Sequence, residues 1–161
     1  MKKILFTITA ALFGFTAFAQ TNFSGTWSIS DKQMITGPEY INALPKLLKI
    51  EQARDSVSIE YTYDTTDGAD QVSKHTYAID GKEMTRTGKT SKRKTVMKLQ
   101  WSADKSALVI TTVFYIPENP AQVDFTRIET WSIKDGHLVI DERSEETRSE
   151  TWQVKGIFDK S

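Results

Sequence analysis

The sequence predicts an all-β protein, an antiparallel up-and-down meander of about 8–10 strands closed into a barrel, with a short helical segment after the first strand. Three observations support this fold class. From Lys46 onward, short runs rich in Val, Ile, Thr and aromatic residues follow one another, as is typical of strands. Turn residues separate the runs, and Asp80-Gly81 and Asp135-Gly136 supply the positive φ of tight hairpins. Helical periodicity is nearly absent, and closure would remove exposed strand edges.

The runs can be assigned to strands in chain order. The expected strands are Gly25–Ser30, Lys46–Ala53, Ser56–Asp64, Gln71–Ile79, Lys82–Gly88, Arg93–Trp101, Ser106–Ile116, Val123–Ile133, His137–Ser144 and Arg148–Ile157. Most connections between them are short enough to join neighbouring antiparallel strands directly. The chain therefore forms a meander.

The expected helix lies in the interruption between the first two strands, Asp31–Leu44. Pro38 is acceptable at a first helical position, and Glu39 suits the positive end of the helix dipole. Pro45 prevents the helix from continuing. Such a segment would either act as a lid over an open end of the barrel or plug that end as a structural element.

A repeated pattern indicates which side chains face inward. The stretch Arg127-Ile-Glu-Thr-Trp-Ser-Ile-Lys recurs 21 residues later as Arg148-Ser-Glu-Thr-Trp-Gln-Val-Lys. Alternation along a strand places residues two apart on the same face. The pairs expected on the inward face are Trp131 with Ile133, Trp152 with Val154, Tyr77 with Ile79, and Leu99 with Trp101.

The N-terminus has the properties of a cleavable secretory signal peptide, residues 1–19. Lys2 and Lys3 precede 15 residues without a charge, and Ala17-Phe18-Ala19 matches the small-residue pattern of a cleavage site. The alternative, a membrane anchor, would need a longer apolar run of about 20 residues. We expect the mature protein to begin at Gln20 and to be exported to a periplasm or the extracellular space.

Residues 20–161 are expected to form one domain. Removing 19 of the 161 residues leaves 142, which is enough for a single core. The chain has no Cys, which excludes disulfides, thiolate metal sites and a thioether-linked lipid. Without Lys2 and Lys3, 19 basic residues face 21 acidic ones, a charge near −2 that does not indicate a nucleic-acid partner. We expect a soluble protein without a lipid anchor or integral membrane association.

Charged residues cluster in two stretches, which we interpret as solvated hairpins rather than binding patches. The basic stretch holds Arg86, Lys89, Lys92, Arg93, Lys94 and Lys98, and the acidic stretch holds Asp141, Glu142, Glu145, Glu146 and Glu150.

No sequence pattern indicates catalysis, a metal or a cofactor. The two histidines, His75 and His137, have no spacing that brings them together, so a zinc site is not expected. The nucleophile elbow, phosphate loops and dinucleotide fingerprints are all absent. We expect a protein that is not an enzyme.

The stretch Phe23-Ser24-Gly25-Thr26-Trp27 resembles the opening of the lipocalin and fatty-acid-binding-protein superfamily, the calycins, where a G-x-W motif begins the first barrel strand. The resemblance covers nearly all of the expected mature chain. It implies that Gly25 and Trp27 are structural and that a basic side chain covers Trp27, for which Arg148 or Arg127 are candidates. The second lipocalin signature and the Arg-x-Tyr pair of fatty-acid binders are missing, so the ligand class is open.

The residues expected to bind a ligand are Tyr61, Tyr77, Phe114, Arg127, Trp131 and Trp152. Aromatic rings would provide apolar area, and Arg127 would anchor a polar group. Alternation also places Glu129 on the face of Trp131 together with Arg127. If both charges point inward, we expect them to pair, because an unpaired buried charge is costly.

The leading functional hypothesis is an exported, soluble, lipocalin-like barrel that binds a small hydrophobic or amphipathic molecule non-covalently. The alternative is a protein-interaction or structural barrel with a filled interior, acting through loops such as Tyr115–Gln122. A third possibility, a small outer-membrane barrel, requires an uncharged lipid face. The strand Val123–Ile133 carries charges on both faces, at a cost of roughly 2–4 kcal/mol for Arg at mid-bilayer.

Overall fold

The computed structural model describes residues 20–40 and 43–161, so the expected signal peptide lies outside the described residues. Ten antiparallel strands form one sheet. The strands are β1 (Gly25–Thr36), β2 (Leu47–Gln52), β3 (Ser56–Asp64), β4 (Asp70–Ala78), β5 (Glu83–Thr87), β6 (Lys94–Trp101), β7 (Ala107–Ile116), β8 (Asn119–Lys134), β9 (His137–Glu146) and β10 (Trp152–Lys160). The predicted all-β meander is confirmed.

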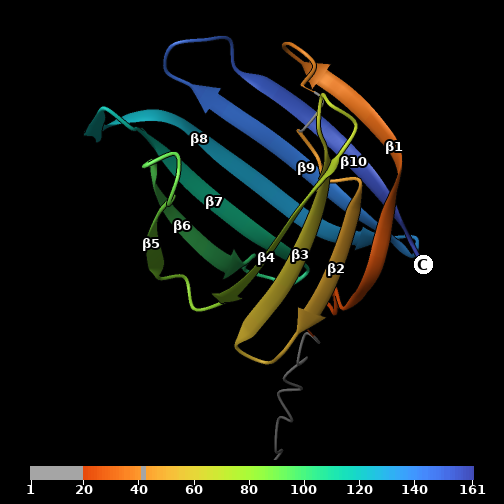
Figure 1. Ribbon diagram of the computed structural model, residues 1–161. Helices are drawn as coiled ribbons and strands as arrows, with labels where there is room; N and C mark the ends of the chain where they lie inside the picture. The colour runs from red at the N-terminus through yellow and green to blue at the C-terminus, as the bar shows by residue number, and fades with distance from the viewer. Residues whose placement is uncertain (1–19, 41–42) are drawn as a thin grey trace, which may run out of the picture.

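The sheet curls into a half-barrel whose strand order is β4-β3-β2-β1-β10-β9-β8-β7-β6-β5. The first and last strands pair in its middle, from Trp27 opposite Lys160 to Thr36 opposite Gln153. The two edges of the sheet, β4 and β5, curve round toward each other (Figure 1). They are joined by no ladder of backbone hydrogen bonds, so the wall has a seam between β4 and β5.

The expected short helix is wrong as far as residues 31–40, 43 and 44 are concerned, because none of these is helical. β1 continues to Thr36 instead of ending near Ser30. It pairs with β2 only as far as Ser28 and then follows β10, with register shifts after Ile29 and after Met34. Such irregularities bend a strand, which allows β1 to serve both halves of the sheet. Within the described ranges, no helix is long and apolar enough to cross a membrane.

Two further boundaries differ from the prediction. The expected loop Tyr115–Gln122 is almost entirely strand, since β7 ends at Ile116 and pairs with Asn119, the first residue of β8. Pro120 is tolerated as the second residue of β8 because it lies where the register shifts, between the pairs Ile116–Asn119 and Tyr115–Val123. The last strand begins at Trp152 rather than Arg148, whose side chain is used in a polar contact with β8.

The hydrophobic core lies against the inner face of the central strands, β1, β2, β8, β9 and β10. Phe23, Leu48, Trp131, Val154 and Phe158 are all fully buried there. The pairs predicted for the inward face all belong to this core or pack against it, which confirms the predicted alternation. The opposite part of the interior, beside β3 to β8, is less completely filled.

Candidate functional site

The unfilled part of the interior is a cavity of about 470 Å³. Its walls come from β3 to β8 and include side chains of both edge strands. Aromatic lining is provided by Tyr61, Tyr63, Tyr77 and Phe114. The exposed lining residues are Arg86, Thr87 and Ser91, which belong to β5 and the following turn. The cavity therefore opens at the seam side of the half-barrel. A hollow of this size, apolar but with a few convergent polar groups, is typical of a small-molecule site.

The aromatic wall carries hydroxyl groups that stay protonated at neutral pH. Tyr61 and Tyr63 stack with ring centroids 6.1 Å apart. Burial raises the pKa of Tyr61 well above its usual range and raises the pKa of Tyr77 to about 12. Each phenol can therefore donate or accept a hydrogen bond. The wall combines apolar area with neutral polar groups.

Arg127 is held at the inner end of the cavity by rings and by one acid. Its guanidinium lies 5.6, 5.9 and 5.5 Å from the ring centroids of Phe114, Phe125 and Trp152. Its Nε lies 2.9 Å from Oε1 of Glu142, yet the N–H is not aligned for a hydrogen bond and both atoms lack a hydrogen-bond partner among the described residues. The contact is thus an ion pair. The expected pairing of Arg127 with Glu129 is wrong.

Glu129 accepts a hydrogen bond of 2.9 Å from Nε1 of Trp131 and lies directly opposite Glu142 in the β8–β9 ladder. Burial is the main reason that the pKa of Glu142 is raised to about 8; Arg127 opposes the rise, and the nearby Glu129 adds to it. Burial also raises the pKa of Glu129, against its Trp131 hydrogen bond and Arg127. Two buried carboxyls facing one guanidinium are most stable when one holds a proton. The inner end then has no net charge at neutral pH.

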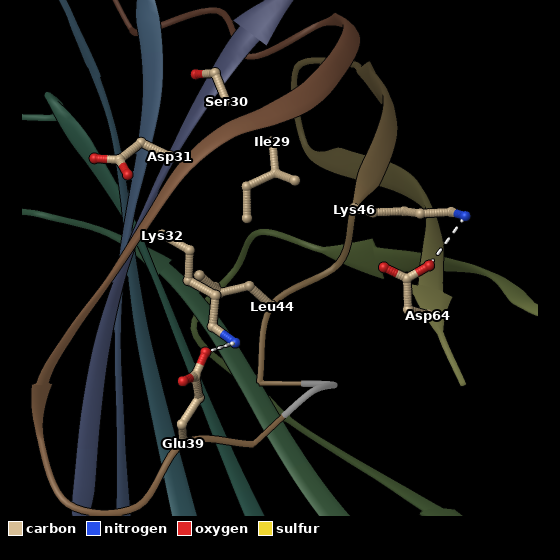
Figure 2. A pocket seen from close by; sticks show the side chains of 8 residues that line it. All are labelled: Ile29, Ser30, Asp31, Lys32, Glu39, Leu44, Lys46 and Asp64. Atoms are coloured by element: carbon tan, nitrogen blue, oxygen red, sulfur yellow. Dashed lines mark ion pairs between the residues drawn. The ribbon is translucent and has the colours of Figure 1, made fainter. Parts of the chain in front are cut away.

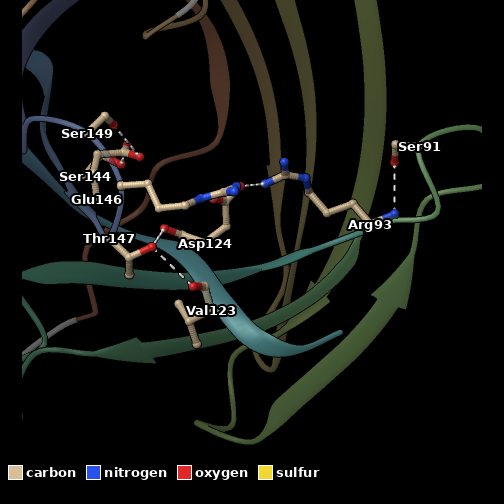
Figure 3. Close-up of polar contacts among 9 residues, drawn as sticks. Ser91, Arg93, Val123, Asp124, Ser144, Glu146, Thr147 and Ser149 are labelled. Atoms are coloured by element: carbon tan, nitrogen blue, oxygen red, sulfur yellow. Dashed lines mark hydrogen bonds and ion pairs between the residues drawn. The ribbon is translucent and has the colours of Figure 1, made fainter. Parts of the chain in front are cut away.

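Asp124 fastens the rim of the cavity by binding two arginines. Its Oδ2 accepts a hydrogen bond of 2.8 Å from Arg93, and its Oδ1 accepts one of 2.6 Å from Arg148. Figure 3 shows Arg93 reaching Asp124 across the interior, with Thr147 donating to the backbone beside it. The Arg148 hydrogen bond, followed by that from Arg93, lowers the pKa of Asp124. Asp124 of β8 thereby joins Arg93, just before β6, to Arg148, just after β9.

A second hollow, of about 600 Å³, lies beside β1 and the segment leading to β2 (Figure 2). Four of its charged groups are already paired, Lys32 with Glu39 at 3.4 Å and Lys46 with Asp64 at 3.1 Å, and Asp31 accepts a hydrogen bond of 2.7 Å from Gln33. Its apolar lining is confined to Ile29 and Leu44. With satisfied charges and little apolar area, this hollow is less suited to hold a ligand than the aromatic cavity.

The structure brings together most of the residues predicted to bind a ligand. Tyr61, Tyr77, Phe114 and Arg127 line the aromatic cavity. Trp152 lies on the other side of Arg127, in a smaller hollow of about 200 Å³. Trp131 is fully buried in the core and contacts the cavity through Glu129.

Sequence reasoning missed Glu142, Arg86 and Arg93, because all three fall in the charged stretches interpreted as solvated hairpins. That interpretation is wrong for Glu142, which is 3% exposed. Arg86 and Arg93 do line the cavity, Arg86 at its exposed mouth. A signal was available for Glu142, since alternation places it on the face of Ile140, a fully buried residue of β9.

Gly25 and Trp27 have the structural role that the resemblance implies. Trp27 is buried, and its Nε1 donates a hydrogen bond of 2.9 Å to the carbonyl of Phe23. The cation above its ring is Lys160, at 5.2 Å, rather than Arg148 or Arg127. Gly25 adopts φ 146°, and a Cβ there would lie 2.6 Å from Cε of Lys160. The glycine therefore leaves room for the lysine that covers the tryptophan.

Comparison with solved structures found the crystal structure of zebrafish ileal bile acid-binding protein in complex with cholic acid. The TM-score is 0.53 at 16% identity, and the match covers 86% of this chain and 98% of that one. The fold is that of the calycins. No protein-family model matches this sequence, and no curated protein matches it. The likeness to this neighbour is thus one of fold, the ten-stranded curled meander.

Among the described residues, no group of three or more His, Cys, Asp or Glu side chains could hold a metal ion. The two histidines contact other kinds of partner. His75 accepts a hydrogen bond from Arg86, and His137 lies 2.7 Å from Asp159. Neither is hydrogen-bonded to a serine or threonine hydroxyl in the part of the chain described.

Proposed function

We propose that this protein is an exported calycin that binds a small hydrophobic or amphipathic molecule non-covalently in the aromatic cavity. The observation that carries the proposal is the cavity itself, about 470 Å³ between aromatic walls. Apolar area gives affinity, and phenol, hydroxyl and carboxyl groups orient the ligand. The neighbour with the same fold was solved with cholic acid, an amphipathic molecule, which supports this class of ligand.

The electrostatics of the inner end favour an uncharged or weakly polar group there. Arg127 is neutralised by Glu142 and surrounded by three rings. A ligand that removed Glu142 from Arg127 would leave a buried carboxylate unpaired, which is costly. The apolar part of the ligand therefore occupies the inner end.

We also propose that the ligand is bound without chemical change and that the signal peptide directs the protein out of the cytoplasm as a soluble, unanchored domain. The contacts of both histidines support a binding protein rather than a hydrolase. Intact-mass measurement of the exported protein should give a chain that begins at Gln20. A chain retaining residues 1–19 in the membrane fraction would contradict export by cleavage.

Binding is tested with the neutral fluorescent probe N-phenyl-1-naphthylamine. Thr95→Trp fills the cavity, because Thr95 lines it, whereas Val96→Trp places the same ring on the other face of β6. We expect the parent protein and Val96→Trp to bind the probe and Thr95→Trp to lose it. Lipid extraction and mass spectrometry of the purified protein should also recover an unmodified amphipathic molecule. Absence of probe binding together with an empty extract would support the filled structural barrel.

A further inference from the structure

The seam between β4 and β5 is bridged by a side chain from the cavity wall. Arg86 of β5 donates a hydrogen bond of 2.8 Å to Nδ1 of His75 and one of 3.3 Å to the carbonyl oxygen of Thr76 on β4. Its guanidinium also lies 5.0 Å from the ring centroid of Tyr77. Arg86 therefore occupies the place where a backbone ladder would otherwise close the wall.

Arg86 differs from the other arginines of the cavity in its charge balance. Arg127 forms an ion pair with Glu142, and Arg93 forms one with Asp124. The bonds of Arg86 go to an imidazole nitrogen and a carbonyl, and no carboxylate of the described residues lies within ion-pair distance of it. Its positive charge is therefore uncompensated at the mouth of an aromatic cavity.

Further hydrogen-bond donors surround this charge. A guanidinium has five N–H groups, and the two bonds to β4 leave others available. Because Nδ1 of His75 accepts from Arg86, the neutral ring carries its proton on Nε2, which can donate. Burial, and then Arg86, lower the pKa of His75, which favours this neutral form. The hydroxyls of Thr87 and Ser91 also line the mouth.

We propose that the ligand of the cavity is an anionic amphiphile whose acid group is bound by Arg86 in the seam between β4 and β5, with its apolar body inward. This inference rests on the proposed function. It assigns the acid group to the mouth rather than to Arg127, which already has a carboxylate partner. An anion at Arg86 gains charge-assisted hydrogen bonds without breaking an existing ion pair. Carboxylate and sulfate head groups share this chemistry.

The test compares an acid with its uncharged twin, 11-(dansylamino)undecanoic acid and its methyl ester. Fluorescence titration gives the Kd of both for the parent protein, Arg86→Gln and the control Arg54→Gln, whose side chain is 94% exposed and lies outside the cavity lining. We expect the parent and the control to bind the acid roughly tenfold more tightly than the ester. Arg86→Gln should lose this preference because its affinity for the acid falls far more than its affinity for the ester. The preference should also decrease between 0.05 and 0.5 M salt, because the mouth is solvent-exposed.

Each outcome decides between the inference and the proposed function. An acid preference that survives Arg86→Gln, or an equal Kd for acid and ester in the parent protein, overturns the acid site while leaving ligand binding intact. Loss of the ester as well in Arg86→Gln would show that Arg86 holds the wall together instead of binding an acid, and would also overturn the proposal. If the parent protein binds neither probe, nor N-phenyl-1-naphthylamine, the proposed function fails together with the inference.

Discussion

Replacing Glu142 by Gln should change how the stability of this protein depends on pH. Glu142 is 3% exposed, and burial raises its pKa from the ordinary value of 4.5 to about 8. Together with the buried Glu129 it forms a pair of carboxyls that holds one proton beside Arg127. Between these two pH values the folded chain retains a proton that the unfolded chain has released. Stability from this group is therefore fully present below pH 4.5 and is lost as the pH rises through 8.

The size of the effect follows from the pKa difference. At 1.36 kcal/mol per unit, a rise from 4.5 to about 8 corresponds to at most about 5 kcal/mol between pH 4.5 and pH 9. Glu129 lies opposite on β8, and its pKa is raised by the same burial, so the two carboxyls titrate as a pair. Gln is neutral at every pH and removes one member of the pair.

Urea denaturation at pH 5, 7 and 9 measures this effect. The free energy of unfolding of the parent protein should fall from pH 5 to pH 9 relative to that of Glu142→Gln. The control Glu83→Gln removes an exposed carboxyl of β5 and should keep the slope of the parent. Parallel curves for the parent protein and Glu142→Gln would refute a proton shared by the two buried carboxyls Glu129 and Glu142.

Three other substitutions test the packing around the site. Gly37→Ala should lower the free energy of unfolding, measured by urea denaturation, by about 1–3 kcal/mol more than Gly68→Ala. Both glycines have positive φ, but a Cβ at Gly37 would lie 2.7 Å from a backbone oxygen, whereas a Cβ at Gly68 would touch nothing. Equal losses of stability would contradict this steric explanation. Asp124→Asn should lower the melting temperature by several degrees at low salt, since two arginines lose their carboxylate, and an unchanged melting temperature would argue against the fastening role. Trp131→Phe should lower the free energy of unfolding by about 1–3 kcal/mol, because the Glu129 carboxyl loses its hydrogen-bond donor. A smaller loss when the same substitution is made in Glu129→Gln would identify that hydrogen bond as the cause.

Local sequence patterns were sufficient to predict the strands and which of their side chains face the interior. Alternation correctly placed Trp131, Ile133, Trp152 and Val154 toward the interior, because the period of two is a property of each strand alone. The same local reasoning failed for residues 31–40, 43 and 44. There the proline and charge pattern of a helix end was present, but the pairing of β1 with β10 held the chain extended through Thr36.

The sequence by itself determined an all-β meander, a first strand opened by Gly25 and Trp27, and an interior lined by Tyr61, Tyr77 and Phe114. The tertiary structure alone decided which charges meet, because a partner is set by the register between strands and by how far the sheet curls. The β8–β9 ladder places Glu142, and not Glu129, in the ion pair with Arg127. Curling brings two unpaired edges close enough for Arg86 to reach His75 across the seam. Contacts between residues distant along the chain leave no periodic trace in the sequence, so the candidate acid site could be recognised only in the folded molecule.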